Sequence, residues 1–132
     1  MIIGGRRKSL IIWGPTRLGK TLWARSLAPH LYFGGLFSMQ ELDALCEDTQ
    51  YAVFDDMQGG FDFFHAYKFW LGCQSEFTVT DKYKGKRTIK WGKPSIWLCN
   101  ENPSMEKVDW EWIEGNATII NLREPIFRAS IG

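Results

Sequence analysis

Residues 14–21 constrain the fold of this chain more than any other segment. They read Gly-Pro-Thr-Arg-Leu-Gly-Lys-Thr and fill every fixed position of the pattern G-x-x-x-x-G-K-[ST]. In that pattern glycines let the backbone curl so that successive N–H groups face phosphate oxygens, and the following helix adds its positive N-terminal end. Lys20 is expected to reach the β- and γ-phosphates of a nucleotide, and Thr21 to ligate magnesium. A glycine-rich structural turn is the alternative. The expected nucleotide-binding residues are Gly14, Pro15, Thr16, Arg17, Leu18, Gly19, Lys20 and Thr21.

The sequence around this loop predicts an α/β fold. An apolar run at 9–13 precedes the loop, and a segment of helical composition at 20–27 follows it. Strands that alternate with helices and end in polar residues indicate a mainly parallel sheet flanked by helices, with a site at the strands' carboxyl ends. At 132 residues one domain is expected, at 9–122, between a basic segment at 1–8 and a tail at 123–132. Further strands are expected at 31–33, 51–56, 77–83, 87–91, 95–99 and 117–122, and further helices at 38–46, 61–71 and 108–114.

Composition excludes several classes of protein. Seven Trp and nine Phe are too many for a disordered chain, and no apolar run approaches the roughly 20 residues that span a bilayer. We therefore expect a soluble, intracellular protein without membrane contact. The net charge of +1 argues against general coating of nucleic acid, but the charges are segregated. Residues 41–62 hold seven acids and no Lys or Arg, whereas residues 82–93 hold six basic residues and no acid.

Polar residues follow two of the predicted buried strands. Adjacent residues of a strand point to opposite sides, so Asp55 and Asp56 are expected to play different parts. We assign Asp55 to magnesium, directly or through water, and Asp56 to orienting and deprotonating an attacking water. Asn100 follows the run 95–99, and its neutral amide can hydrogen-bond a γ-phosphate and the attacking water. The alternatives are a pair of acids in a surface turn and an Asn before an ordinary loop.

A basic segment with an aromatic residue inside it begins at Lys82. It lies at a predicted hairpin tip, where cations can meet the phosphates of a single strand and a ring can stack on a base or sugar. A solvated charged hairpin is the alternative. The expected DNA-binding residues are Lys82, Tyr83, Lys84, Lys86 and Arg87.

Taken in order, these motifs resemble the helicase domain of replication initiator (Rep) proteins of circular single-stranded DNA viruses, in the geminivirus and genomovirus branch. Residues 14–27 look like the Walker A motif of that group and its continuation, and 53–57 look like its Walker B motif. Residues 80–96 are similar to its B′ region, and 97–100 to its motif C. The likeness extends from about residue 8 to residue 122.

The resemblance implies a P-loop NTPase of the AAA+-like superfamily 3 helicase type. Such a protein is an ATP- and Mg²⁺-dependent translocase on single-stranded DNA, acting in viral rolling-circle replication in the host nucleus. The resemblance also implies a hexameric ring of identical subunits, in which an arginine from the neighbour completes each site. Arg123, after the last predicted strand, is the candidate for that arginine, and a surface arginine is the alternative.

Members of this family also carry an N-terminal nicking domain with a histidine-containing metal motif. Here the only histidines, His30 and His65, are isolated, so we expect the helicase part without nicking activity. Two other functions stay open. A small P-loop phosphotransferase of the nucleoside-kinase type would use the same loop, because the loop does not name the phosphate acceptor. A non-catalytic module for ring assembly or DNA binding would hold nucleotide without releasing phosphate.

Overall fold

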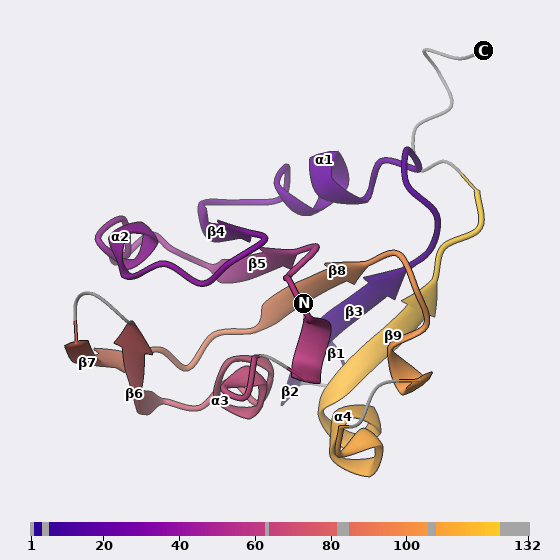
Figure 1. The fold of residues 1–132 in the computed structure, drawn as a ribbon. Coiled ribbons are helices and arrows are strands. Elements are labelled where there is room, and N and C mark those ends of the chain that lie inside the picture. Colours follow the sequence, from indigo (N-terminus) through magenta and orange to yellow (C-terminus); the bar gives the residue numbers. More distant parts are fainter. Residues whose placement is uncertain (1, 4–5, 63, 82–84, 106–107, 125–132) are drawn as a thin grey trace.

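The computed structural model describes residues 2–3, 6–62, 64–81, 85–105 and 108–124. Its main feature is a five-stranded sheet in which each neighbouring pair of strands is parallel (Figure 1). The expected α/β fold with a mainly parallel sheet is therefore confirmed. In order across the sheet, the strands are β4 (His30–Gly34), β5 (Tyr51–Asp55), β8 (Ser95–Cys99), β3 (Ser9–Trp13) and β9 (Ala117–Asn121).

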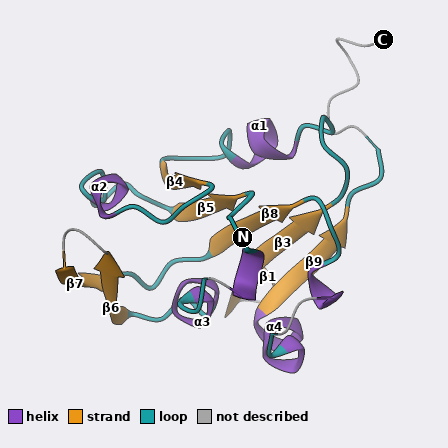
Figure 2. Cartoon of the chain, viewed as in Figure 1, coloured by secondary structure: helices purple, strands orange, loops and turns teal. Residues whose placement is uncertain are grey.

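Helices flank this sheet on both faces (Figure 2). Helix α1 (Lys20–Ala24) covers one face, while α3 (Tyr67–Leu71) and α4 (Trp110–Asn116) lie against the other. Helix α2 (Met39–Leu42) contacts the edge strand β4. None of the described helices is long and apolar enough to cross a membrane. Two short 3-10 turns lie at Gly60–Asp62 and Pro103–Met105.

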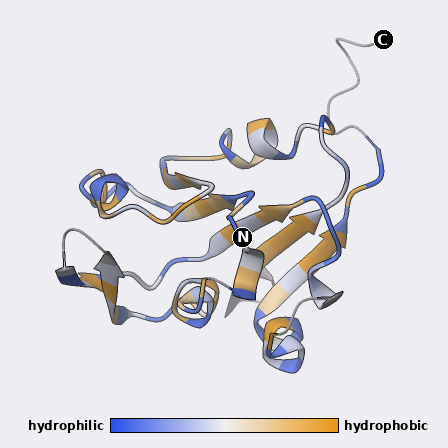
Figure 3. Ribbon diagram, in the orientation of Figure 1, coloured by the Kyte–Doolittle hydropathy of each residue, from blue (hydrophilic) through white to orange (hydrophobic). Residues whose placement is uncertain are grey.

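The central strands are buried on both faces, which explains their unbroken apolar runs. The first four residues of β3, β5 and β8 are all buried. Leu10 and Ile12 of β3 pack on the α1 side of the sheet, whereas Ile11 packs on the α3 side. Figure 3 shows the hydrophobic residues concentrated along β3 and β8. Each fully buried Leu or Ile stabilises the fold by roughly 1.5–3 kcal/mol. The central strands therefore hold the loops at their ends in fixed positions.

Aromatic rings fill the layer between the sheet and α3. Trp70 of α3 meets Phe33 and Phe54 edge-on, with ring centroids 5.7 Å and 5.3 Å apart. Phe61 stacks on Trp97 of β8 with a centroid distance of 4.1 Å. All five rings are buried, so they anchor the segment after β5 to the sheet.

The prediction of a single helix at 61–71 is wrong. A 3-10 turn at Gly60–Asp62 comes first, and α3 begins only at Tyr67. Aromatic residues have only moderate helix propensity, and the stacking of Phe61 on Trp97 favours the turn.

The other helices also differ in length from their expected ranges. Helix α1 ends at Ala24 and not at residue 27. After Ala24 the hydroxyl of Ser26 donates to the carbonyl of Trp23 and competes with the helical hydrogen bonds. Helix α2 starts after Ser38 as expected, since the Ser38 hydroxyl accepts from the N–H of Gln40, but it ends at Leu42.

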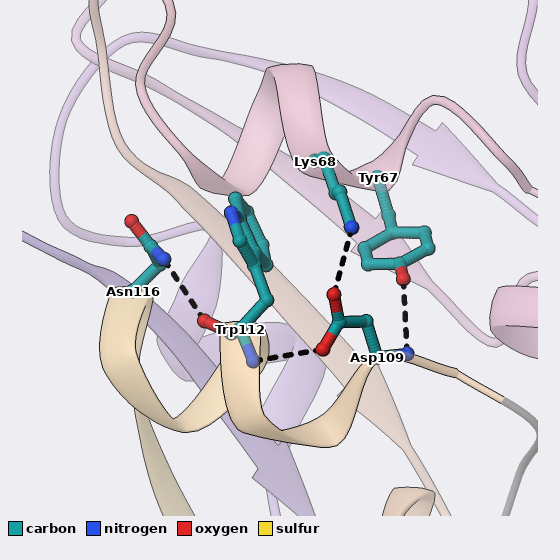
Figure 4. Close-up of polar contacts among 5 residues, drawn as sticks. All are labelled: Tyr67, Lys68, Asp109, Trp112 and Asn116. Atoms are coloured by element: carbon teal, nitrogen blue, oxygen red, sulfur yellow. Dashed lines mark hydrogen bonds and ion pairs between the residues drawn. The ribbon is translucent and has the colours of Figure 1, made fainter.

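Polar contacts join α3 to α4 on the far side of the sheet from α1 (Figure 4). Lys68 forms an ion pair with Asp109 at 2.9 Å, and the Asp109 N–H donates to the hydroxyl of Tyr67. Asp109 also caps α4 by accepting from the N–H of Trp112, and its pKa is lowered, chiefly by Lys68. At the other end, α4 extends to Asn116, past the expected end at 114, because the backbone N–H of Ala117 still donates to the carbonyl of Ile113; the Asn116 amide donates to the Trp112 carbonyl.

A separate antiparallel hairpin consists of β6 (Glu76–Asp81) and β7 (Gly85–Lys90). Gly85 and Lys86 were expected in the turn but belong to β7, because Thr80 pairs with Lys86 in the observed register. The basic segment at 1–8, expected to lie outside the domain, contains the short antiparallel strands β1 (Ile2–Ile3) and β2 (Arg6–Arg7).

Candidate functional site

The predicted phosphate-binding loop leaves the carboxyl end of the central strand β3. Neighbouring strands hold its start, since the N–H of Gly14 donates to the carbonyl of Cys99 at 3.1 Å. On the other side, the N–H of Leu122 donates to the carbonyl of Trp13 at 2.8 Å. A Cβ added at Gly14 would collide with the carbonyl oxygen of Leu122. The first glycine of the motif is therefore required by the close approach of the segment after β9.

The rest of the loop is open to solvent and conformationally unusual. Arg17 and Gly19 have φ angles of 65° and 88°, in the left-handed region that is costly for residues other than glycine. Because α1 has only five residues, its dipole adds less to anion binding than the sequence suggests. Pro15, Thr16 and Arg17 are exposed, and Leu18 and Gly19 are half-buried.

Lys20 is a buried cation at the centre of the site, with 8% of its surface exposed. Its Nζ donates to the carbonyls of Gly14 and Pro15, both at 2.7 Å, and to Oδ1 of Asn100 at 3.3 Å. Burial lowers the pKa of Lys20 below its usual value, and the nearby Cys99, Asp55 and Asp56 offset this only in part. The ammonium group thus joins the loop after β3 to the residue after β8.

A hydrogen bond joins Thr21 of α1 to Asp55 at the end of β5. The Thr21 hydroxyl donates to Oδ2 of Asp55 at 2.6 Å. Hydroxyl and carboxylate oxygens are the ligands that magnesium prefers, and it commonly takes only one or two from the protein beside phosphate oxygens. This pair therefore fits the metal-ligand set expected from the sequence. Within the described ranges, no group of three or more His, Cys, Asp and Glu side chains is arranged to hold a metal ion.

Asp56 lies one residue beyond β5 and differs from Asp55 in its surroundings. Its φ is 49°, its N–H donates to the carbonyl of Leu98, and the residue is exposed. Asp55 is half-buried and bound by Thr21. The two acids thus lie in different surroundings, one hydrogen-bonded and one exposed.

Asn100 and Arg123 complete the predicted set at this edge of the sheet. Asn100 is exposed after β8 and accepts from Lys20. Arg123 is exposed and follows Leu122, whose carbonyl abuts Gly14. The backbone therefore brings Arg123 to the loop of its own chain, while the hydrogen-bonded set consists of Lys20, Thr21, Asp55 and Asn100.

Sequence reasoning missed Tyr32 of β4. Its hydroxyl donates to Oδ2 of Asp55 at 2.7 Å, and the guanidinium of Arg25 lies 3.9 Å from the centre of its ring. Burial, followed by the hydrogen bond to Asp55, raises the pKa of Tyr32 to about 12. One signal was available in the sequence, namely a large polar ring two residues before Gly34, at the end of a short strand.

The hairpin provides two of the predicted DNA-binding residues within the described part of the chain. Lys86 is exposed on β7, and Arg87 forms an ion pair with Asp43 at 2.9 Å. Arg87 is therefore partly engaged by an acid next to α2. Lys82, Tyr83 and Lys84 lie outside the described residues.

A cavity of about 730 Å³ lies apart from these residues, between the hairpin, α3 and the segment after β4. Its lining includes Phe37, Phe64, Phe69 and Thr80, and it contains none of the predicted site residues. The candidate site is therefore the carboxyl edge of the sheet and not this cavity.

Comparison with known proteins found relatives among viral replication proteins. The chain is 44% identical over 117 residues to the replication-associated protein of Bean yellow dwarf virus, a match that covers 86% of this chain and 34% of that protein. It is 40% identical over 123 residues to that of Chloris striate mosaic virus (90% and 33%), and 37% over 121 residues to that of Maize streak virus genotype C (88% and 33%). The chain thus spans about a third of the length of the curated relatives it matches. No protein-family model matches it.

Proposed function

We propose that this chain is a magnesium-dependent ATPase of the superfamily 3 helicase type. In this proposal it translocates along single-stranded DNA during viral rolling-circle replication in the host nucleus. The observation that carries the proposal is the hydrogen-bonded convergence of Lys20 with Asn100 and of Thr21 with Asp55 at one edge of the sheet. In open α/β sheets ligands bind outside the carboxyl ends of the strands. Asp55 is the last residue of β5, Lys20 and Thr21 come after β3, and Asn100 comes after β8.

Each residue of the site has a part in phosphate chemistry. The ammonium group of Lys20 neutralises phosphate charge, and its burial strengthens that attraction because the surroundings screen it less than water does. Bound magnesium would add further charge neutralisation, with Thr21 and Asp55 as the residues that hold it. Asp56 orients and deprotonates the attacking water, and Asn100 senses the γ-phosphate through its amide.

The relatives support the biological setting of this proposal. The viral proteins of the comparison are replication-associated proteins, and they match 86–90% of this chain at 37–44% identity. We assign the exposed Lys86 and the rest of the hairpin to the backbone of single-stranded DNA. We further propose a homo-hexameric ring in which an arginine of the neighbouring subunit completes each site. The position of Arg123 beside the loop of its own chain favours a contact within the subunit over the expected one across the interface.

The test is ATPase activity measured across a range of protein concentrations, with and without single-stranded DNA. Sites shared between ring subunits predict that activity per subunit rises steeply with concentration and is stimulated by DNA. Activity that is independent of both, and stimulated instead by a nucleoside acceptor, would replace the helicase with a phosphotransferase. Tight ATP binding without phosphate release would leave only a non-catalytic module.

Two variants show whether the observed activity comes from this site. Lys20→Ala removes the buried ammonium group and should abolish hydrolysis, and turnover equal to the wild type would reject the phosphate-loop assignment. Asn100→Ala changes an exposed side chain with one hydrogen bond to Lys20, so it should keep the fold and nucleotide binding but lower turnover. Circular dichroism of both variants separates loss of chemistry from loss of structure.

A further inference from the structure

Two hydroxyl groups converge on one oxygen of Asp55. Thr21 donates to Oδ2 at 2.6 Å from α1, and Tyr32 donates to the same Oδ2 at 2.7 Å from β4. Among the described residues, both hydrogen bonds to this carboxylate therefore end on Oδ2. The carboxylate is held in one orientation, with Oδ1 as the oxygen left for a metal ion or its water.

The fold makes room for Tyr32 to reach Asp55. In the parallel register Tyr32 is opposite Val53, and Gly34 is opposite Asp55. A Cβ built on Gly34 would lie 2.9 Å from Cε2 of the Tyr32 ring and 3.3 Å from its hydroxyl oxygen. The ring therefore crosses directly over Gly34, and a side chain at residue 34 would push it away from the carboxylate.

A second group of contacts holds the same ring from the helix side. The guanidinium of Arg25 lies 3.9 Å from the ring centroid, a distance typical of a cation–π contact. Arg25 Nε in turn donates to Nε2 of His30 at 3.2 Å. His30 is fixed by stacking on Tyr51, with ring centroids 5.0 Å apart. The ring of Tyr32 is thus covered by Arg25, the residue after α1, and His30 of β4 holds that guanidinium in place.

From this geometry we propose that Tyr32 is a positioning residue that orients the Asp55 carboxylate toward magnesium. The proposal rests on the proposed function, because it takes Asp55 to be the magnesium-side acid of a nucleotide site. Groups that orient a metal ligand through a hydrogen bond commonly change metal affinity by about 10–100-fold when they are removed. Tyr32 acts through Asp55 and does not itself contact the nucleotide.

The experiment compares wild type and Tyr32→Phe by the binding of fluorescently labelled ADP in two conditions, a magnesium titration and EDTA. We expect Tyr32→Phe to require about 10–100-fold more magnesium for half-maximal tight binding. Affinity in EDTA should equal that of the wild type, because the hydroxyl acts only through the metal ligand. An equal loss in both conditions, or an unchanged magnesium requirement, would overturn the proposal.

Two further variants separate positioning from a general effect on structure. Tyr51→Phe removes a hydroxyl that donates to the carbonyl of Ala24 on the same side of the sheet but has no contact with Asp55, so its magnesium requirement should match the wild type. Gly34→Ala removes no functional group of the site, but its Cβ pushes the Tyr32 ring away from Asp55. It should therefore raise the magnesium requirement as Tyr32→Phe does. Failure of the wild type to bind the nucleotide at all would reject the proposed function, whereas binding with equal magnesium dependence in all variants rejects the positioning role alone.

Discussion

Gly14→Ala tests whether the packing around the first glycine of the loop is as tight as the structure indicates. The new Cβ would collide with the carbonyl oxygen of Leu122, a backbone atom that cannot rotate away like the end of a side chain. Relief therefore requires the segment after β9 to move away from β3. That movement strains the hydrogen bond from the Leu122 N–H to the Trp13 carbonyl, which is 2.8 Å long.

The size of the effect follows from these two contributions. Overpacking a filled site costs about 1–3 kcal/mol, and weakening one backbone hydrogen bond adds about 1 kcal/mol. The free energy of unfolding should thus fall by about 2–4 kcal/mol. For a chain of this size that corresponds to a melting temperature lower by roughly 8–16 °C.

Thermal unfolding followed by circular dichroism measures this loss. Gly115→Ala is the matched control, because a Cβ at Gly115 in α4 meets no atom within 4 Å. Alanine favours the helix over glycine by roughly 0.5–1 kcal/mol, so the control should melt slightly above the wild type. A Gly14→Ala protein that melts within about 2 °C of the wild type would refute the packing argument.

Two other predictions concern charge. Replacing Lys82, Lys84 and Lys86 together with alanine should weaken binding of single-stranded DNA and flatten the plot of log affinity against log salt by about 0.7 for each phosphate that the protein no longer neutralises. Nucleotide binding should persist, and an unchanged salt slope would reject the hairpin assignment. The second prediction follows from the pKa of Tyr32, which is about 12 when folded and about 10 when unfolded. Between these two values the folded protein keeps a proton that the unfolded chain releases. The contribution of Tyr32 to the free energy of unfolding is therefore full below pH ~10 and is lost as the pH rises toward ~12. Urea unfolding between those limits should show a smaller loss of stability in Tyr32→Phe than in the wild type.

The strands were predictable because burial on both faces removes the alternation of polar residues. The runs of β3, β5 and β8 needed no knowledge of their neighbours to be identified. Helix boundaries were harder, since tertiary contacts decided them. Phe61 stacks on Trp97 of a strand that comes more than thirty residues later in the chain, and no local pattern contains that contact.

In the candidate site, too, residues marked by a local sequence pattern were predictable, and those that depend on tertiary contacts were not. Residues at the ends of apolar runs, such as Asp55 and Asn100, could be named because parallel strands share a carboxyl edge. The polar ring before Gly34 was not enough to identify Tyr32, because its contact with Asp55 depends on β4 lying beside β5 and on the ring taking the space that a side chain at residue 34 would fill. The ion pair between Arg87 and Asp43 was equally hidden, since it joins a hairpin to the end of α2.

The pairing of β3 with β9 has a consequence for synthesis of the chain on the ribosome. Ser9 lies opposite Ala117 in the sheet, so one wall of the loop at Gly14 comes from a strand made more than a hundred residues later. Closing so long a segment is slow compared with local folding. Until β9 emerges, β3 presents an unpaired edge and the loop lacks the backbone that surrounds Gly14. The site is thus completed by the last strand of the sheet to be translated.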